Sequence, residues 1–438
     1  MTESPDSHRA SADDSSKRLI EESNRCVACG LCLPHCPTYR LLQSEADSPR
    51  GRIALIHGVA TKRIPLNKQF VQHLDRCLSC RACESVCPNH VAYGYLADEA
   101  HKIIRLSAAS QPQTRQADAF QTRLLTARLS AWVTQPARLE RLRGWLYLLQ
   151  KSGAIHLFRK VNFWNRNLVD KILRQLPPVV FPRMEANKKR FFLPAWQAFY
   201  PATGVEKGTV GLFLGCIARI TDAETLNAAI FVLNRIGYSV RIPAGQTCCG
   251  ALYQHTGEPE QAAQLMRQNR AAFAGSGIQA IITTASGCGA QLTESDTGGV
   301  MVCDISKFLM GAADWDTIPI KPLAKTIAVH DPCSLRHVLH DAVYPYQLLK
   351  LIPDAQVIAL ADNDQCCGAA GTYFIRQPAL ADRLLNDKIK ALDRSGAQLL
   401  ATSNVGCSMH MASGLRVIGS GVEVLHPVTL LARQMSMQ

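Results

Sequence analysis

The sequence predicts an α+β multidomain protein with a helical cysteine-rich module, a helical linker and two copies of an α/β unit. Three observations support this: eight of the 17 cysteines form two tight runs before residue 90, the other nine lie among apolar strands, and the region between is basic with a helical period. The expected segments are a disordered lead-in (1–17), the cysteine-rich module (18–101), the linker (102–205) and the two α/β units (206–320 and 321–438).

Composition excludes several classes of protein. The chain has 438 residues, of which 47% are apolar and 19% charged, enough for two or three domains with hydrophobic cores and too apolar for general disorder. No apolar run approaches the roughly 18 residues of a membrane span. Residues 1–17 are polar and lack the apolar core of a secretory signal. We therefore expect a cytoplasmic protein whose cysteines serve metal or redox chemistry rather than disulfides.

One cysteine pattern, C-x2-C-x2-C-x3-C-P, occurs twice in the first hundred residues. Two-cluster bacterial ferredoxins use this spacing for [4Fe–4S] clusters, and the last cysteine of each run ligates the other cluster. A tight loop delivers three thiolates to three corners of a cluster, so the fourth thiolate comes from elsewhere. Two zinc sites are the alternative, but zinc prefers paired C-x2-C units with wider separations. The expected ligands are Cys26, Cys29, Cys32 and Cys87 for the first cluster, and Cys77, Cys80, Cys83 and Cys36 for the second.

The residues around these runs favour helices. Pro49-Arg-Gly-Arg52 opens a helical pattern, and residues 70–74 suggest another helix within the 40-residue spacer. This long spacer indicates a helical ferredoxin domain rather than a compact β-rich one. Arg25 and Arg76 each precede the first cysteine of a run. Each either donates a hydrogen bond to a cluster sulfur, which would raise its potential, or is an ordinary surface arginine.

The linker carries the excess positive charge of the chain. Between Lys102 and Arg190 there are 18 lysines and arginines against four acids, whereas the whole chain has a net charge of +13. A basic amphipathic stretch can contact an anionic membrane, here as a peripheral contact on the cytoplasmic face of the inner membrane. It can also dock an acidic partner, or be a solvated helical connector. Nucleic-acid binding ranks last, because no reader module accompanies the charge.

The C-terminal half is an internal duplication. A single cysteine, a Cys-Cys-Gly triplet and a final cysteine recur 117, 118 and 119 positions later. A near-constant offset indicates two copies of one unit. Proline opens a helix in each copy, at Pro259 and Pro378. Apolar strands are expected at 209–214, 278–284, 326–330 and 397–402. The copies comprise Cys216, Cys248-Cys249-Gly250 and Cys288, then Cys333, Cys366-Cys367-Gly368 and Cys407.

These cysteines are expected to meet at the carboxyl ends of the strands, where open α/β sheets bind ligands. Four thiolates gathered there favour metal ligation over structural thiols. The expected ligands are therefore Cys216, Cys248, Cys249 and Cys288 in the first copy, and Cys333, Cys366, Cys367 and Cys407 in the second.

Four other residues near these units have weaker signals. Cys303 has no counterpart in the second copy and is expected in the core. His330 precedes Cys333 by three residues, and either supports a ligand or is held at its strand end by a hydrogen bond to the backbone. Thr221 and Glu224 have the spacing of a helix capping box.

Two ferredoxin runs followed by two C…CCG…C units resemble the family of glycolate oxidase (glycolate dehydrogenase) iron–sulfur subunits. The C-terminal half is also similar to the cysteine-rich (CCG) domains of heterodisulfide reductases, which have a fifth cysteine per copy. Here Gln291 and His410 stand at that position, which argues against disulfide reduction and for a four-thiolate cluster or no cluster. The segments that carry the resemblance are 49–53, 73–78, 284–290, 366–373 and 404–407.

The resemblance implies an electron-transfer subunit without catalytic residues of its own, in a flavin-dependent complex that oxidises glycolate to glyoxylate. Electrons would pass from an FAD-containing partner through two [4Fe–4S] clusters, and any further iron–sulfur clusters in the CCG domains, to a quinone or similar acceptor. The sequence agrees, because it has no dinucleotide-binding fingerprint and we expect no flavin on this chain. Alternatives are the corresponding subunit of a lactate or anaerobic glycerol-3-phosphate dehydrogenase, a heterodisulfide reductase-like enzyme, and a metal-stabilised nucleic-acid-binding protein.

Overall fold

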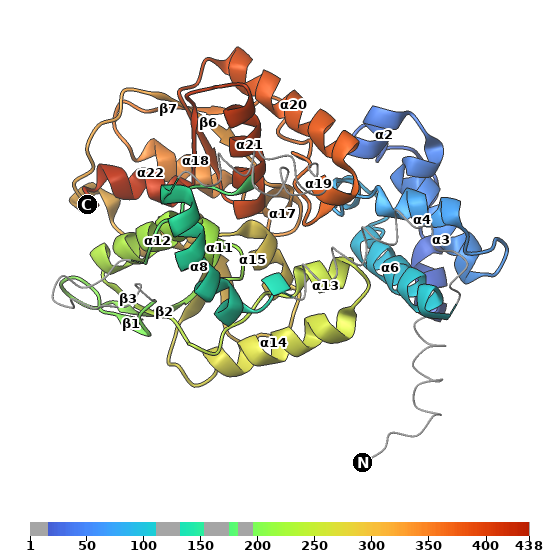
Figure 1. Ribbon diagram of the computed structural model, residues 1–438, viewed down its shortest axis with the longest axis horizontal. Helices are drawn as coiled ribbons and strands as arrows, with labels where there is room; N and C mark the ends of the chain where they lie inside the picture. Colours follow the sequence, from blue (N-terminus) through green and yellow to red (C-terminus); the bar gives the residue numbers. More distant parts are fainter. Residues whose placement is uncertain (1–15, 111–131, 153–174, 183–195, 438) are drawn as a thin grey trace.

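The computed structural model describes residues 16–110, 132–152, 175–182 and 196–437. It has the expected α+β multidomain organisation, with a helical N-terminal module beside two sheet-containing units (Figure 1). The expected lead-in falls outside the described residues up to position 15, and its last two residues are already part of a helix over 16–24.

The N-terminal module consists of short helices around the cysteine runs. Ser48 caps α3 by accepting a hydrogen bond from the Gly51 amide, and Asn67 caps α4 through the Phe70 amide. The apolar faces of the helices meet in a small core that includes Ile56, and the core holds the two cysteine loops in place. The elements are α2 (Pro37–Leu42), a 3₁₀ turn η1 (Glu45–Asp47), α3 (Pro49–Ala60), α4 (Lys68–Asp75), α5 (Ala82–Ser85) and α6 (Tyr93–Ser110).

The described part of the linker lies against the first α/β unit. Helix α6 crosses the predicted boundary at residue 101, and α8 (Pro136–Lys151) packs against α11 (Ala218–Thr221). Arg219 pairs with Glu140 at 3.1 Å, and Leu139 is buried beside the cysteines of that unit. This part of the linker is therefore a packed helix. The basic residues of 111–131, 153–174 and 183–195 lie outside the described residues.

The first α/β unit contains a five-stranded sheet in the order β1-β3-β2-β4-β5. All pairs are parallel except β1 with β3. The strands are β1 (Phe199–Tyr200), β2 (Gly208–Phe213), β3 (Tyr238–Arg241), β4 (Ala280–Thr283) and β5 (Met301–Asp304). The helices after α11 are α12 (Ala223–Arg235), α13 (Ala251–His255), α14 (Pro259–Phe273), α15 (Ser286–Thr293) and α16 (Ile305–Ala312).

The second unit repeats this order in a parallel sheet, β7-β6-β8-β9. The duplication expected from the cysteine spacing is thus also a duplication of topology. The strands are β6 (Thr326–His330), β7 (Gln356–Ala359), β8 (Leu399–Thr402) and β9 (Glu423–Leu425). The helices are α17 (Cys333–His337), α18 (Val343–Lys350), α19 (Tyr373–Arg376), α20 (Pro378–Ser395), α21 (Val405–Val417) and α22 (Pro427–Gln434).

Two local expectations differ from the structure. The short strand β1 lies in the predicted linker but pairs with β3 of the first sheet, because two residues are too few to give a strand pattern. The capping box does not form: Asp222 is the residue before α12, and the Thr221 hydroxyl donates to the Ile217 carbonyl instead. A local side chain-to-backbone bond has competed successfully with the cap.

The two units share one hydrophobic core. Helix α12 of the first packs on α22 of the second, and α16 of the first packs on α18 of the second. Because α12 is equivalent to α18 and α16 to α22, the same helix pairing occurs twice across the interface. Buried Leu233 and Leu431 belong to this core, and the hydroxyls of Thr225 and Thr429 lie 3.2 Å apart across it. The arrangement is that of a pseudo-twofold pair, and it fixes the two cysteine sites relative to each other.

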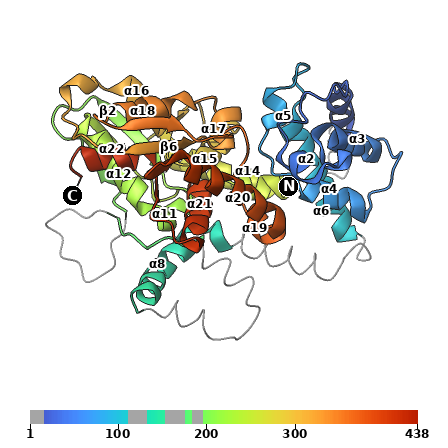
Figure 2. The same ribbon diagram turned by 90° about the horizontal axis from the view of Figure 1, so that it is seen from above.

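The N-terminal module contacts the second unit at the α19–α20 end (Figure 2). Arg40 pairs with Asp387 at 2.7 Å and Arg376 with Asp75 at 2.6 Å. None of the described helices is both long enough and apolar enough to cross a bilayer.

Candidate metal centres

The cysteines expected to hold the first cluster surround one cavity. The loop over residues 26–32 lines it. Cys87 of the second run also lines this cavity, as cross-ligation requires. Cys29 is exposed, so this site reaches the protein surface. Burial raises the pKa of the Cys32 thiol to about 11, so a thiolate here calls for a positively charged partner such as cluster iron.

The cysteines expected to hold the second cluster surround a neighbouring cavity. Cys77, Cys80 and Cys83 come from one run and Cys36 from the other. Cys83 lines both cavities, so the two sites are adjacent. The structure thus brings together each four-cysteine set that the spacing predicts, and the residues fit two cuboidal clusters.

The backbone of the two loops explains how three cysteines turn toward one point. Ala28 and Ser79, which occupy equivalent positions in the two runs, both have left-handed backbone angles, with φ of 54° and 49°. Gly30 and Arg81, also equivalent, have φ of 87° and 60°. Left-handed non-glycine residues are uncommon and cost energy, so the surrounding helices must enforce this curl. Strained loops of this kind are typical of ligand sites.

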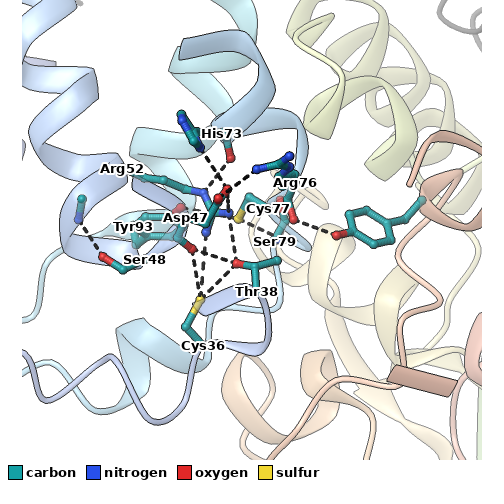
Figure 3. A network of polar contacts seen from close by, with 12 residues as sticks. Cys36, Thr38, Asp47, Ser48, Arg52, His73, Arg76, Cys77, Ser79 and Tyr93 are labelled. Atoms are coloured by element: carbon teal, nitrogen blue, oxygen red, sulfur yellow. Dashed lines mark hydrogen bonds and ion pairs between the residues drawn. The ribbon is translucent and has the colours of Figure 1, made fainter. Parts of the chain in front are cut away.

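A buried polar network supports the second cavity (Figure 3). Arg52, only 1% exposed, contacts the Cys36 sulfur at 3.9 Å and donates to the Thr38 hydroxyl and the His73 carbonyl. Buried Asp47 accepts from Arg52 at 3.5 Å and from Arg76 at 3.0 Å. Asp47 therefore provides a counter-charge to both arginines, which burial of a charged group requires.

Arg52, rather than Arg25 or Arg76, is the arginine at a cluster cysteine. Arg25 donates to the Asn89 carbonyl and Arg76 to Asp47. Sequence reasoning missed this role, although Arg52 was visible in the Pro-Arg-Gly-Arg segment. Tyr93, 3% exposed, was missed as well, and its hydroxyl donates to the Cys77 sulfur at 3.4 Å. Donors to cluster sulfur favour the reduced, more negative state.

The first CCG site gathers its cysteines at the carboxyl end of the sheet. The thiol of Cys248 interacts with that of Cys216 on one side and Cys249 on the other, and Cys249 interacts with Cys288. The interaction with Cys248, followed by burial, raises the pKa of the Cys216 thiol well above its usual range. The structure therefore brings all four expected residues together in a string in which Cys216, Cys248 and Cys249 are buried and Cys288 is partly exposed.

The second CCG site has the same string. Cys333 interacts with Cys366, Cys366 with Cys367, and Cys367 with Cys407. The interaction with Cys366, followed by burial, raises the pKa of the Cys333 thiol.

The backbone conformation of each turn requires the glycine of the Cys-Cys-Gly triplet. Gly250 and Gly368 have φ of 88° and 89°, and a Cβ on Gly368 would lie 2.9 Å from the Ala381 carbonyl oxygen. In each turn the glycine amide donates to the sulfur of the first cysteine, Cys248 or Cys366, at 3.4 Å. Only glycine allows this close turn, in which both neighbouring thiols face the site.

The second CCG site also contains His330 at the end of β6. Its Nδ1 lies 3.0 Å from the Thr402 hydroxyl, so a side chain rather than a backbone group holds it. Burial lowers its pKa well below the usual range, which keeps the imidazole neutral. Of the other weak candidates, Cys303 is buried in the shared core as expected.

The second ferredoxin site lies directly against the second CCG site. Cys80 packs beside Cys333 and Cys366 in a cluster that also contains Leu78 and Tyr373. Burial and then the charge of Cys333 raise the pKa of the Cys80 thiol. Nothing in the sequence indicates this contact, because it joins cysteines more than 250 positions apart.

Comparison with known proteins agrees with this architecture. A family model described as a 4Fe-4S dicluster domain matches residues 22–91, and one described as a cysteine-rich domain matches residues 210–293 and again 327–412. A chain from Bacillus cereus named lactate utilization protein A 2 is 25% identical, over 52% of this chain and 99% of its own length.

Two relatives match nearly end to end. The probable glycolate oxidase iron-sulfur subunit of Bacillus subtilis is 33% identical, over 93% of this chain and 92% of the relative. The glycolate oxidase iron-sulfur subunit of Escherichia coli is 32% identical, over 89% of this chain and 90% of the relative. Together with the two adjacent ferredoxin sites and the duplicated CCG units, these matches show that the chain belongs to the family of glycolate oxidase iron–sulfur subunits.

Proposed function

We propose that this chain is the electron-transfer subunit of a flavin-dependent glycolate dehydrogenase complex, which oxidises glycolate to glyoxylate. The observation that carries the proposal is the pair of adjacent cavities, each lined by three cysteines of one run and by the last cysteine of the other, with Cys83 lining both. Bound clusters would supply one-electron transfer. This chain would supply their thiolates, namely Cys26, Cys29, Cys32 and Cys87 for the first and Cys77, Cys80, Cys83 and Cys36 for the second.

The two ferredoxin sites differ in exposure and in what they contact. The first site reaches the surface at Cys29, whereas the second lies beside Arg52 and the second CCG unit. Electrons would enter from an FAD-containing partner and leave toward a quinone or similar acceptor. The eight CCG cysteines would bind metal as well: Cys216, Cys248, Cys249, Cys288, Cys333, Cys366, Cys367 and Cys407.

A peripheral membrane contact would suit a quinone acceptor, and α8 offers a surface for it. Trp145 and Leu148 on this helix are 69% and 59% exposed, in the basic segment of the chain. Aromatic and aliphatic side chains among basic residues are the composition that binds anionic lipid surfaces.

The test uses the complex, in which this chain is expressed with its flavoprotein partner and purified anaerobically. We expect about eight irons with matching acid-labile sulfide for the two ferredoxin sites, and glycolate-dependent reduction of a quinone analogue. Cys77→Ser should abolish quinone reduction but leave reduction of an artificial dye by the flavin subunit. Zinc without sulfide would refute the electron-transfer function. Turnover with lactate or glycerol 3-phosphate but not with glycolate would refute glycolate as the substrate.

A further inference from the structure

The two CCG sites differ at the strand end that faces their cysteines. The first strand of the second copy ends in His330, and the equivalent position of the first copy, 117 residues earlier, is Phe213. Phe213 packs against Phe273, with ring centroids 6.4 Å apart, so it belongs to the apolar core of the first unit. The duplication has thus placed a metal-ligating residue type in only one of the two sites.

The His330 side chain is buried and aimed at thiols. It is 2% exposed, and its Nε2 has no hydrogen-bond partner among the described residues. A ring nitrogen of His330 and the sulfurs of Cys367 and Cys407 all lie within 4.8 Å of one another. A buried imidazole nitrogen without a partner is costly unless something binds it.

We propose that His330, Cys367 and Cys407 bind a single divalent metal ion of the Zn²⁺ class, so that the two CCG domains hold chemically different centres. The inference rests on the proposal above that CCG cysteines bind metal, and narrows it for the second domain. Tetrahedral zinc bonds sulfur at about 2.3 Å, which sets its ligand atoms about 3.8 Å apart. The observed spacing suits one ion. In a cuboidal cluster each thiolate sits on a different iron and the sulfurs stand farther apart.

The residues behind the ligands support the same site. The Thr402 hydroxyl contacts Nδ1 of His330 at 3.0 Å, the usual way in which a protein orients a metal-binding histidine. Asn404 donates to the Cys407 sulfur at 3.4 Å. In the first copy, the equivalent threonine, Thr283, instead contacts the Cys303 carbonyl. The orienting contact therefore accompanies the histidine and is absent from the first site.

Charge also distinguishes the two sites. Lys388, 2% exposed, lies close to Cys366 and Cys367, whereas the equivalent residue on α14 of the first copy is the neutral Asn269. Two thiolates and a neutral histidine balance one divalent ion. A third thiolate would add a negative charge that Lys388 compensates. Cys366, whose thiol interacts with Cys367, would supply the fourth position.

The experiment measures metal in the full-length chain purified with its partner. We expect about one zinc per chain in addition to cluster iron, and zinc-edge X-ray absorption with both sulfur near 2.3 Å and nitrogen near 2.0 Å. His330→Gln should lower zinc affinity at least tenfold in a chelator competition. His330→Cys should restore binding and convert the spectrum to sulfur only. The matched control is His410→Gln, which alters another buried histidine of the same unit.

The outcomes separate this inference from the proposed function. Retention of zinc by His330→Gln would overturn the role of the histidine, and iron with sulfide in place of zinc at this site would overturn the single ion. Electron paramagnetic resonance of the ferredoxin clusters reports folding of each variant. If those clusters were missing while zinc binding still depended on His330, the proposed electron-transfer function would be refuted. The zinc site of His330, Cys367 and Cys407 would then still be supported.

Discussion

The hydroxyl of Tyr373 donates a hydrogen bond of 2.9 Å to the carbonyl of Arg76, the residue before the first cysteine of the second run. Tyr373 begins α19, directly after the Cys-Cys-Gly turn of the second CCG unit. This single bond therefore ties the turn that carries Cys366 and Cys367 to the loop that carries Cys77. The relative position of the two sites depends on such contacts across the domain boundary.

Tyr373→Phe tests how strongly this contact holds the two parts together. The variant loses one buried hydrogen bond and leaves the Arg76 carbonyl without that donor, at a cost of about 1 kcal/mol. Local opening should become about fivefold more frequent, measured as amide hydrogen exchange of residues 76–80. Tyr344→Phe, on the α18 face of the unit, is the control. Unchanged exchange in Tyr373→Phe would show that the ion pairs Arg40–Asp387 and Arg376–Asp75 suffice.

If each cluster takes its fourth ligand from the other run, loss of one cysteine should remove the cluster held mainly by the other run. Cys36→Ser should remove the second cluster, although Cys36 belongs to the first run, and lower iron from about eight to about four per chain at the ferredoxin sites. Cys303→Ser changes an equally buried cysteine in the shared core and should retain all the iron. The paramagnetic signal of the remaining cluster identifies it. Loss of the first cluster instead would contradict the assigned ligand sets.

Arg52 should raise the potential of the second cluster. Its guanidinium contacts the Cys36 sulfur and brings positive charge into a buried site, which stabilises the reduced cluster. A hydrogen bond involving a charged group contributes about 1.5 kcal/mol, equivalent to roughly 60 mV for one electron. Arg52→Gln should therefore lower the midpoint potential of the second cluster by that amount.

A redox titration followed by electron paramagnetic resonance measures this effect. Arg50→Gln is the control, because Arg50 lines the first cavity and pairs with Glu45 at 2.7 Å. It should leave the second cluster unchanged. An equal shift in both variants would mean that net charge, rather than the contact with Cys36, sets the potential.

The raised pKa of Asp304 should make the stability of the protein depend on pH. Burial raises the pKa of this carboxyl, 1% exposed at the start of α16, to about 7, against about 3.9 in an unfolded chain. Between these values the folded state holds more protons than the unfolded state, so the contribution of Asp304 to stability falls as the pH rises from about 4 to about 7. The upper bound of this loss is about 4 kcal/mol.

Asp304→Asn keeps an oxygen that can accept the Ser306 amide but removes the charge. The variant should melt at a higher temperature than the parent at pH 8, and the difference should shrink at pH 5. Thermal melting of both proteins at the two pH values measures this. A difference independent of pH would show that the carboxyl is not protonated near neutrality.

Cysteine spacing by itself predicted the two sets of ferredoxin cysteines that line common cavities, the duplication of the CCG units and the position of their cysteines at strand ends. It could do so because cluster geometry and a tight turn impose fixed local separations, as at Cys26, Cys29 and Cys32. Helix starts at Pro49, Pro259 and Pro378 were also predictable, because proline is favoured in the first turn.

Only the tertiary structure decided which residues complete these sites. The contact of Arg52 with Cys36, the bond of Tyr93 to Cys77 and the packing of Cys80 against Cys333 arise when helices distant in sequence meet. No local period or spacing encodes such meetings, because each depends on how the apolar faces of several helices pack together. His330 illustrates both contributions. Its place before Cys333 was visible in the sequence, but its buried and unpartnered nitrogen is a property of the folded chain.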